Sequence, residues 1–467
     1  MTNALNPMLT LRRLGSAFFA LLLLAGVTRA QPPIAPGENL TLQTAIELTL
    51  RNHPSALAAR SEVAAMNERI GEARSQLLPQ VYGSAQYLGA TDNPIGDTSY
   101  LNPGYIPRSP GTAHQRSADA AQTFVPENNY EAAIGVSQYL FDFGRTRGFI
   151  KQREYETAAA GAASKLTELD LIYEVTQRYF AFLAAHQKVK VYDKAVAQRG
   201  EEDLHAARVK ASAGLVPQID VSTADAELAR AKVQLLDAQN LEQTSKAALD
   251  NAMGLGADAT DYKLAGVLTY RALTGEIGTY YATALRLRPD LSEIEEQARA
   301  EGAKITQYRS DFLPTVHAVA GYNTLGTGTP VANNYDAGIV ISWPIFNGFE
   351  TEHQISEAKF HREALRHQIE ALRQRIFLEV KSAFLNWQAS LERIQRMELT
   401  VAASRSRLEL ATKRYDAGLG NIIELTDAER FYIEDDAAYI DALYGYAVTK
   451  AALDLASAQP TSDGYKP

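Results

Sequence analysis

The sequence predicts a mainly α-helical fold with a small β part, built from two copies of one unit. Two stretches of 67 residues, 145–211 and 349–415, contain no proline and follow a helical pattern. At 1.5 Å per residue each would be about 100 Å long, far beyond an ordinary globular helix. Four short segments instead alternate apolar and polar residues, as β-strands do.

The duplication is indicated by four pairs of motifs that recur in the same order. The two members of a pair are 235 positions apart in the first two pairs and 205 or 204 apart in the last two. The distance falls because the segment between the second and third motifs is 30 residues shorter in the second half. Such ordered matches are typical of an internal repeat. We therefore predict a first repeat over 31–255, a connector over 256–278, a second repeat over 279–457 and a flexible tail over 458–467. The pairs are His53-Pro54 with Arg288-Pro289, Leu78-Pro79 with Leu313-Pro314, Phe141-Asp142 with Phe346-Asn347, and Gly214 with Gly418.

The N-terminus has the pattern of a cleaved signal peptide. Arg12 and Arg13 precede an apolar run over 14–27, and a small residue, Ala30, ends the following segment. The run is short for a membrane-spanning helix, and a proline-rich stretch follows it directly. We therefore predict export with removal of residues 1–30, in preference to an N-terminal membrane anchor.

Charge and cysteine content exclude several functional classes. The chain carries 46 Lys and Arg against 55 Asp and Glu, a formal charge of −9 without a basic block, so no nucleic-acid partner is expected. It contains no cysteine, which excludes disulfides, thiolate metal sites, cysteine nucleophiles and a lipid attached to cysteine. No internal stretch is apolar enough to cross a bilayer as a helix.

Each repeat begins with a helical segment that ends at a Leu-Pro pair, because proline stops a helix. A hairpin of two alternating strands follows, at about 79–141 and 314–346. A loop over 90–129 separates the first two strands; it could gate, bind a surface ligand or be disordered.

One such hairpin would fit a soluble protein, but two matching hairpins with aromatic ends in an exported chain favour transmembrane β-strands. Four strands cannot close a barrel, and lipid does not tolerate an open edge, so several chains would have to share one barrel. The aromatic residues that we assign to the membrane interface are Tyr87, Tyr130, Tyr139, Tyr322, Tyr335 and Trp343.

The long helices pair with returning helices predicted over 220–255 and 424–456. Apolar residues in 349–415 recur at a mean spacing close to 3.5, which predicts a left-handed coiled coil. In the first returning helix small and large apolar residues alternate, and the small ones let helices approach closely. This series is Val221, Ala224, Leu228, Ala231, Leu235 and Ala238.

The turns between the long helices are the most distinctive local feature. Gly214 and Gly418 suit a left-handed helix stop, and Pro217 and Asn421 suit the restart. Ordinary helix–turn–helix punctuation would explain the glycines, but it does not explain apolar residues at an exposed tip, which often mark a partner contact. The tip residues that we assign to partner docking are Gly214, Leu215, Val216, Asp220, Gly418, Leu419 and Ile422.

With its duplication, Leu-Pro hairpin entries, Phe-Asp and Phe-Asn exits and two glycine tips, the chain resembles the TolC-like outer-membrane channel family over nearly all of its mature length. The resemblance implies a homotrimer with one 12-stranded barrel in outer-membrane lipid and a periplasmic α-barrel of long helices below it. It also implies a small mixed region at mid-height, formed from about 256–278 and the chain ends. No lipid anchor is available, so the barrel alone would hold the chain in the membrane.

The resemblance further implies an aperture at the second tip. A Tyr and an acidic pair of the family's best-known member match Tyr415, Glu424 and Asp427, which in a trimer would form carboxylate rings that select cations. Favourable charge at a helix start is the alternative role of the two acids. Gly420 stands where that member has Arg, and the double glycine after each second strand is replaced by Phe143-Gly144 and Gly348-Phe349. The sequence therefore leaves open whether the resting aperture is closed.

No catalytic residues, cofactor or metal site are expected. The chain has no phosphate-binding loop, no HExxH and no nucleophile elbow, and His353, His361 and His367 lack metal-ligand spacing. The resemblance implies a passive export duct that docks to a periplasmic membrane-fusion adaptor and, through it, to an inner-membrane pump of RND or ABC type.

Two other functions remain as alternatives, a structural or adhesive trimeric coiled coil and a soluble periplasmic scaffold. The internal duplication argues against the adhesin, because fibrous adhesins run in one direction. The substrate, whether drugs, metals, dyes or secreted proteins, is not written in the sequence.

Overall fold

A computed structural model describes residues 37, 39–90, 127–256, 261–271, 275–326 and 332–459. The predicted signal peptide, most of the loop 90–129 and all but two residues of the predicted tail lie outside these ranges. The chain is mainly helical with one four-stranded sheet and one two-stranded sheet, as the sequence predicts.

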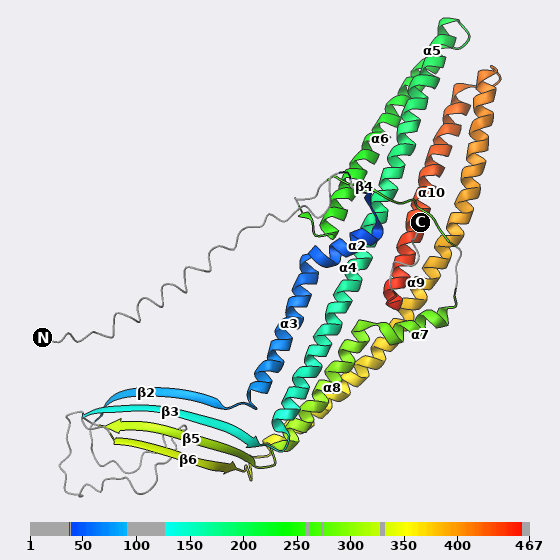
Figure 1. The fold of residues 1–467 in the computed structure, drawn as a ribbon. Coiled ribbons are helices and arrows are strands. Elements are labelled where there is room, and N and C mark those ends of the chain that lie inside the picture. The colour runs from blue at the N-terminus through cyan, green and yellow to red at the C-terminus, as the bar shows by residue number, and fades with distance from the viewer. Residues whose placement is uncertain are drawn as a thin grey trace, which may run out of the picture.

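The molecule is long and narrow, with the larger sheet at one end and two helical hairpin tips at the other (Figure 1). One hairpin is formed by α4 (Arg145–Ala197), the π-helical segment η3 (Gln198–Asp203) and α5 (Leu204–Ser212), which return as α6 (Gln218–Ala252). The other is formed by α9 (Glu350–Asp416) and α10 (Ile422–Ser457). We call them the first and the second hairpin.

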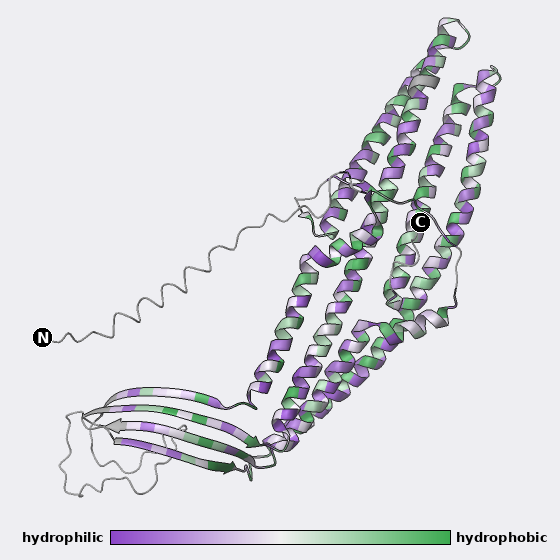
Figure 2. Ribbon diagram, in the orientation of Figure 1, coloured by the Kyte–Doolittle hydropathy of each residue, from purple (hydrophilic) through white to green (hydrophobic). Residues whose placement is uncertain are grey.

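The helices lie side by side in one layer. In the half that ends in the tips, the order across the layer is α6, α4, α10 and α9. In the half next to the sheet, α3 (Pro54–Ser75) takes the place of α6, and α8 (Pro289–Ser310) takes the place of α10. Only α4 and α9 run through both halves. Apolar and polar residues are mixed along all of these helices (Figure 2).

The helices that run through only one half of the layer meet end to end at mid-height, α6 with α3 and α10 with α8. Gly254, at φ +72°, follows α6 and lies against the backbone of His53, where a Cβ would come within 2.8 Å of the His53 Cα. At the matching joint of the second repeat, Arg288 donates to the carbonyl of Ala456 in the last turn of α10 at 3.4 Å. The repeated His53-Pro54 and Arg288-Pro289 motifs therefore mark the two joints.

The larger sheet has the antiparallel order β2 (Gln80–Ala90), β3 (Glu127–Phe141), β5 (Thr315–Gly326) and β6 (Ala332–Ser342). The register brings most of the apolar residues of the four strands to one face, because directly paired residues share a face; Tyr82, Val319 and Val340 lie on the opposite one. β2 and β6 are the edges. The apolar face carries Val81, Ala85, Tyr87, Tyr130, Ile134, Val136, Val316, Ala320, Tyr322, Tyr335, Ile339 and Ile341, and the opposite face carries Ser84, Gln86, Glu131, Ser137, His317, Asn323, Asn334 and Asp336.

The sheet connects to the long helices through turns that the Phe-Asp and Phe-Asn motifs stabilise. The Asp142 carboxylate accepts from the backbone N–H of Gly144 at 3.1 Å and of Thr146 at 2.7 Å. The positions of the missing double glycines all have positive φ, and Phe143 and Phe349 adopt +52° and +66° there. These two phenylalanines therefore take a left-handed conformation that glycine would adopt without strain.

The first long helix differs from the sequence prediction in one respect. Helical structure extends from Arg145 to Ser212 close to the predicted limits, but it is not one uninterrupted α-helix, because η3 interrupts it at Gln198–Asp203. Single π-helical turns are rare and often occur at functional sites. α9 is continuous over its 67 residues, and its predicted apolar stripe lies buried or half-buried from Ile369 to Tyr415.

The main core lies at mid-height, where a connector over 261–271 crosses the layer. Its strand β4 (Lys263–Leu264) pairs in parallel with β1 (Asn39–Leu40). The Tyr179 hydroxyl of α4 donates to the carbonyl of Ala265 at 2.7 Å, and the Tyr262 hydroxyl donates to Asp250 of α6 at 2.6 Å. On the other side, Tyr270 donates to Glu398 of α9 at 3.0 Å. The connector therefore joins both hairpins.

None of the helices within the described ranges combines the length and the apolar character needed to cross a bilayer.

The connector gives a test of this description. Tyr262→Phe removes a buried hydrogen bond to a carboxylate, which should lower the free energy of local opening by about 1.5–3 kcal/mol. Tryptic cleavage after Lys263 should become about ten- to hundredfold faster if local opening limits it. Tyr281→Phe serves as the control, because Tyr281 packs on Phe377 and has no hydrogen bond among the described residues. Equal cleavage of the Tyr262→Phe variant and the native chain would contradict the role of this bond.

Candidate functional site

The tip of the first hairpin is closed by a glycine helix stop. Gly214 has φ +70°, and the backbone N–H of Leu215 donates to the carbonyl of Lys210 at 2.9 Å. This bond spans the last turn of α5 and satisfies a carbonyl that the helix itself leaves free. Pro217 then stands just before the first residue of α6 with an extended backbone.

The tip of the second hairpin repeats this geometry with a better helix start. Gly418 has φ +72°, and the N–H of Leu419 donates to the carbonyl of Arg414 at 2.8 Å. The Asn421 side chain accepts from the N–H of Glu424 at 2.8 Å and so caps α10. Both turns therefore have the conformation that the sequence predicts for their glycines.

Both tips present apolar side chains to solvent, and the structure corrects one of the predicted residues. Leu215 is 75% exposed and Leu419 is 74% exposed, whereas Val216 and Asp220 are half-buried. Ile422, which we expected to be exposed, is buried, because the first turn of α10 faces Tyr415. Two residues that the sequence analysis did not assign, Ile219 and Ile423, are exposed beside the tips instead.

Tyr415 is the centre of a small core inside the second hairpin. Its side chain is 5% exposed and packs among apolar residues of α9 and α10. Its hydroxyl is buried and has no hydrogen-bond partner among the described residues. Burial and, after it, the negative charge of Asp220 raise the pKa of this hydroxyl. The residues of this core are Ala411, Tyr415, Ile422, Leu425 and Ala428.

Lys210 joins the two tips. Its Nζ lies 3.8 Å from the centre of the Tyr415 ring, donates to the Tyr415 carbonyl at 3.2 Å and lies 3.7 Å from an Asp416 carboxylate oxygen. A cation over an aromatic face is attracted by the ring. The last turn of α5 is thus held against the last turn of α9.

The two predicted aperture acids are half-exposed, and each lies beside an arginine. Arg414 Nε is 3.1 Å from Glu424 Oε1, and an Nη of the same arginine donates to the carbonyl of Leu419 at 3.3 Å. Arg430 Nη2 is 3.3 Å from Asp427 Oδ1. Arg414 therefore supplies a guanidinium at this tip, although Gly420 occupies the position where the resemblance places one. The Arg414–Glu424 pair could not be predicted from the sequence, because it depends on the helix stop at Gly418.

The predicted interface aromatics are all exposed, but they do not all share one face of the sheet. Tyr87 lies opposite Tyr130 with ring centres 5.3 Å apart, and Tyr322 lies opposite Tyr335, all on the apolar face. Tyr139 is the exception, because the register places it on the polar face, where its ring lies 4.1 Å from that of His317. It therefore does not share the face of the other four tyrosines. A register shift after Tyr139 brings Phe141 opposite Val316 of the apolar face instead.

No group of His, Asp and Glu side chains that could hold a metal ion occurs among the described residues.

Comparison with known proteins identifies a family and a fold. The family model described as "outer membrane efflux protein" matches residues 45–255 and 280–459. The toluene efflux pump outer membrane protein TtgC of Pseudomonas putida is 25% identical over 312 residues, which cover 65% of this chain and 63% of that protein. The outer membrane efflux protein BepC of Brucella suis is 22% identical over 427 residues, which cover 91% of this chain and 86% of BepC.

The fold is also that of a solved channel. The chain superposes on a crystal structure of CusC, described as forming a transmembrane channel, with a TM-score of 0.73 and 16% sequence identity. The superposition covers 92% of this chain and 97% of that one. The two matched segments of the family model correspond to the two repeats and leave out the connector between them.

The geometry around Tyr415 gives a second test. Tyr415→Phe should leave the tip unchanged, because it removes a hydroxyl that has no hydrogen-bond partner. Tyr415→Ala should destabilise the tip by about 3 kcal/mol or more, since it empties the core of the second hairpin. The rate of tryptic cleavage after Lys413 and Arg414 measures the difference. If the Phe variant is cleaved as fast as the Ala variant, the hydroxyl and not the ring holds this tip.

Proposed function

Since the chain belongs to the outer membrane efflux protein family, we propose that it is the passive exit duct of a tripartite efflux or type I secretion system. In this proposal three copies form one channel that crosses the outer membrane and extends into the periplasm. The tips receive substrate from an inner-membrane pump through a periplasmic adaptor, and the pump supplies the energy.

The observation that carries the proposal is the open edge of the four-stranded sheet. One edge is formed by β2 and the other by β6, so each leaves a row of backbone N–H and C=O groups without a strand partner among the described residues. Lipid cannot satisfy such groups, and a membrane sheet must therefore close. Pairing β6 of one copy with β2 of the next would close it.

The number of copies follows from the width of the barrel. Two copies would give eight strands, and the interior of an eight-stranded barrel is just wide enough for its own side chains to fill. Three copies give twelve strands and are the smallest number that leaves an open passage. The polar face of the sheet would line that passage, and the apolar face would contact lipid.

The spacing of aromatic residues supports this orientation. Tyr335 lies on the apolar face of β6, and Trp343 directly follows the last residue of this strand, eight residues or roughly 27 Å of extended chain away. A strand tilt of about 40° reduces this to a height of roughly 20 Å, close to the apolar band of an outer-membrane barrel.

The helical layer has unpartnered edges of the same kind. α6 and α9 end the layer near the tips, and both expose large apolar residues. Closing the layer into a ring would place α9 of one copy beside α6 of the next and cover such residues. Among them are Val233 and Leu236 of α6, and Leu378, Leu385 and Leu399 of α9.

The exposed tips support a docking role. The patch of leucine and isoleucine at the end of each charged helical hairpin is exposed in the described structure, and such patches mark interaction sites. We assign adaptor docking to Leu215, Leu419 and their neighbours, with Ile219 and Ile423 added and Ile422 confined to the core.

A susceptibility panel tests the proposed function. A deletion strain should become hypersensitive to some of a set of dyes, detergents, antibiotics and metal salts, or else lose a secreted protein from its medium. The intact gene should restore the phenotype, whereas Leu419→Asp should not, because a carboxylate at the tip opposes apolar docking.

Val267→Asp is the matched control, because Val267 is 72% exposed on the connector, far from the tips. It should complement fully, with outer-membrane levels of both variants checked by immunoblot. A deletion strain that matches the parent in both assays would count against the proposed duct. Full complementation by Leu419→Asp would count against the docking role of the tips.

Ion selectivity tests the aperture. The purified channel in a planar bilayer should prefer cations, because carboxylates of Glu424 and Asp427 recur in every copy. Glu424→Gln combined with Asp427→Asn should lower the cation-to-anion permeability ratio, since it also leaves Arg414 and Arg430 without these carboxylate partners. Glu276→Gln, which removes an exposed acid at the start of α7 (Ile277–Leu287), should leave the ratio unchanged. A ratio that the double substitution does not change would remove these acids from the aperture.

A further inference from the structure

A cluster of charged residues is buried between the two hairpins, about 10–20 Å along the helices from the tips. Arg199 lies in the π-helical segment η3 and is 4% exposed. Glu227 comes from α6 of the same hairpin, and Glu429 comes from α10 of the second hairpin and is 2% exposed. Buried charges are rare unless they are paired, so this cluster needs an explanation.

The arginine is held tightly on one side and loosely on the other. Arg199 Nη1 donates to Glu227 Oε2 at 2.7 Å, within the first hairpin. Toward the second hairpin, Arg199 Nε is 3.6 Å from Glu429 Oε2, which is too long for a hydrogen bond. Arg199 Nε has no hydrogen-bond partner among the described residues, whereas the Glu429 carboxyl group also contacts the side chain of Asp203 in η3. The contact between Arg199 and Glu429 is therefore electrostatic attraction without the geometry of a strong pair.

Negative charge exceeds positive charge around Glu429. Burial, and after it the neighbouring carboxylate of Asp203 in η3, raise the pKa of Glu429. Arg199 lowers it, and Glu227 contributes a further increase. Arg230 pairs with Glu227 on the outer side of α6. Without Arg199, the carboxylates of Asp203, Glu227 and Glu429 would face one another in a site with little water.

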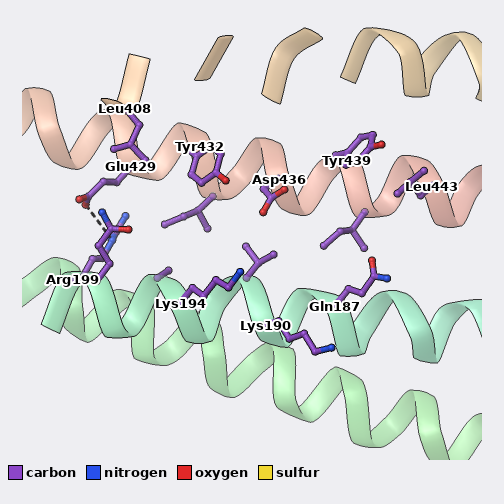
Figure 3. Close-up of a pocket in the computed structure, with 15 residues that line it drawn as sticks. Gln187, Lys190, Lys194, Arg199, Leu408, Glu429, Tyr432, Asp436, Tyr439 and Leu443 are labelled. Atoms are coloured by element: carbon purple, nitrogen blue, oxygen red, sulfur yellow. Dashed lines mark ion pairs between the residues drawn. The ribbon is translucent and has the colours of Figure 1, made fainter. Parts of the chain in front are cut away.

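A cavity lies between the helices next to the cluster. It has a volume of about 510 Å³, is partly open to solvent and extends between α4 and α10 from Arg199 and Glu429 toward Gln187 and Leu443 (Figure 3). At this level the space between the two helices leaves room for α10 to move.

We propose that Arg199 is a positioning residue of the duct, which holds the second hairpin against the first just above the aperture. Its loose pair with Glu429 is the contact that breaks when the aperture widens. The tight bond to Glu227 keeps the arginine on the first hairpin throughout, so that the pair can form again. This inference rests on the proposed channel function and adds a residue that governs its opening.

Single-channel recordings on the assembled full-length protein in planar bilayers test this inference. Arg199→Gln should raise the ratio of open to closed dwell times about tenfold or more, because removing one partner of a buried ion pair strongly destabilises the contact. Glu429→Gln should raise the ratio less than Arg199→Gln, since it removes the pair but leaves the arginine bonded to Glu227. The double variant Arg199→Gln/Glu429→Gln should return toward native dwell times, because one of the facing carboxylates is then gone.

Arg288→Gln is the matched control. Arg288 is a half-buried arginine that also lies between two acids, Asp290 and Glu379, but at the opposite end of α10. The Arg288→Gln variant should leave the dwell times unchanged. Heat-modifiable mobility on gels confirms that each variant is assembled. If Arg199→Gln does not assemble, Arg199→Lys replaces it and should raise the dwell-time ratio less, because lysine lacks the fork that reaches both carboxylates.

Three results would overturn the inference: native dwell times in assembled Arg199 variants, an equal change in Arg288→Gln, or a double variant that stays open. A native protein that forms no channel at all would instead contradict the proposed function, and the inference with it.

Discussion

The backbone of the sheet edges imposes the constraint on which the rest of the structure depends. In the part of the chain that the structure describes, strands β2 and β6 each leave hydrogen-bonding groups unpaired, and the helices continue this open layer instead of wrapping around a central core. A single copy buries only part of the apolar surface on α6 and α9. The proposed ring of copies would satisfy the strand edges and the helix edges by one and the same arrangement.

The duplication explains how one chain supplies both a sheet and a long layer of helices. Each repeat contributes a strand pair, one long helical element that runs through both halves of the layer, and three shorter helices, of which two meet end to end at mid-height; α2 (Leu42–Asn52) and α7 are the third in each repeat. The repeats then diverge where function requires it. The second tip carries an asparagine cap, a buried tyrosine and two arginine–carboxylate pairs, whereas the first tip contributes Lys210 and, farther from its end, Arg199. The two hairpins are thus similar in shape but unequal in chemistry.

Most of the fold could be predicted from the sequence, because its signals are local. Proline-free stretches of 67 residues and alternating strands with aromatic ends require no knowledge of distant contacts. Three features depended on such contacts and were missed. Ile422 is buried because α10 packs on Tyr415, Tyr139 changes face because β3 has an irregular register, and Arg199 meets a carboxylate 230 positions away. The π-helical turn at Gln198–Asp203 has no recognised sequence signal.

We propose that only a ring of three copies satisfies the hydrogen-bonding groups at the sheet edges. The mass of the detergent-extracted protein under native conditions tests it most directly, with circular dichroism of the same sample to establish that it is folded. A ring of three copies predicts one species with three times the mass of the mature chain after subtraction of bound detergent. A folded species with the mass of one chain would contradict it, because the sheet edges would then have to be satisfied without a second copy.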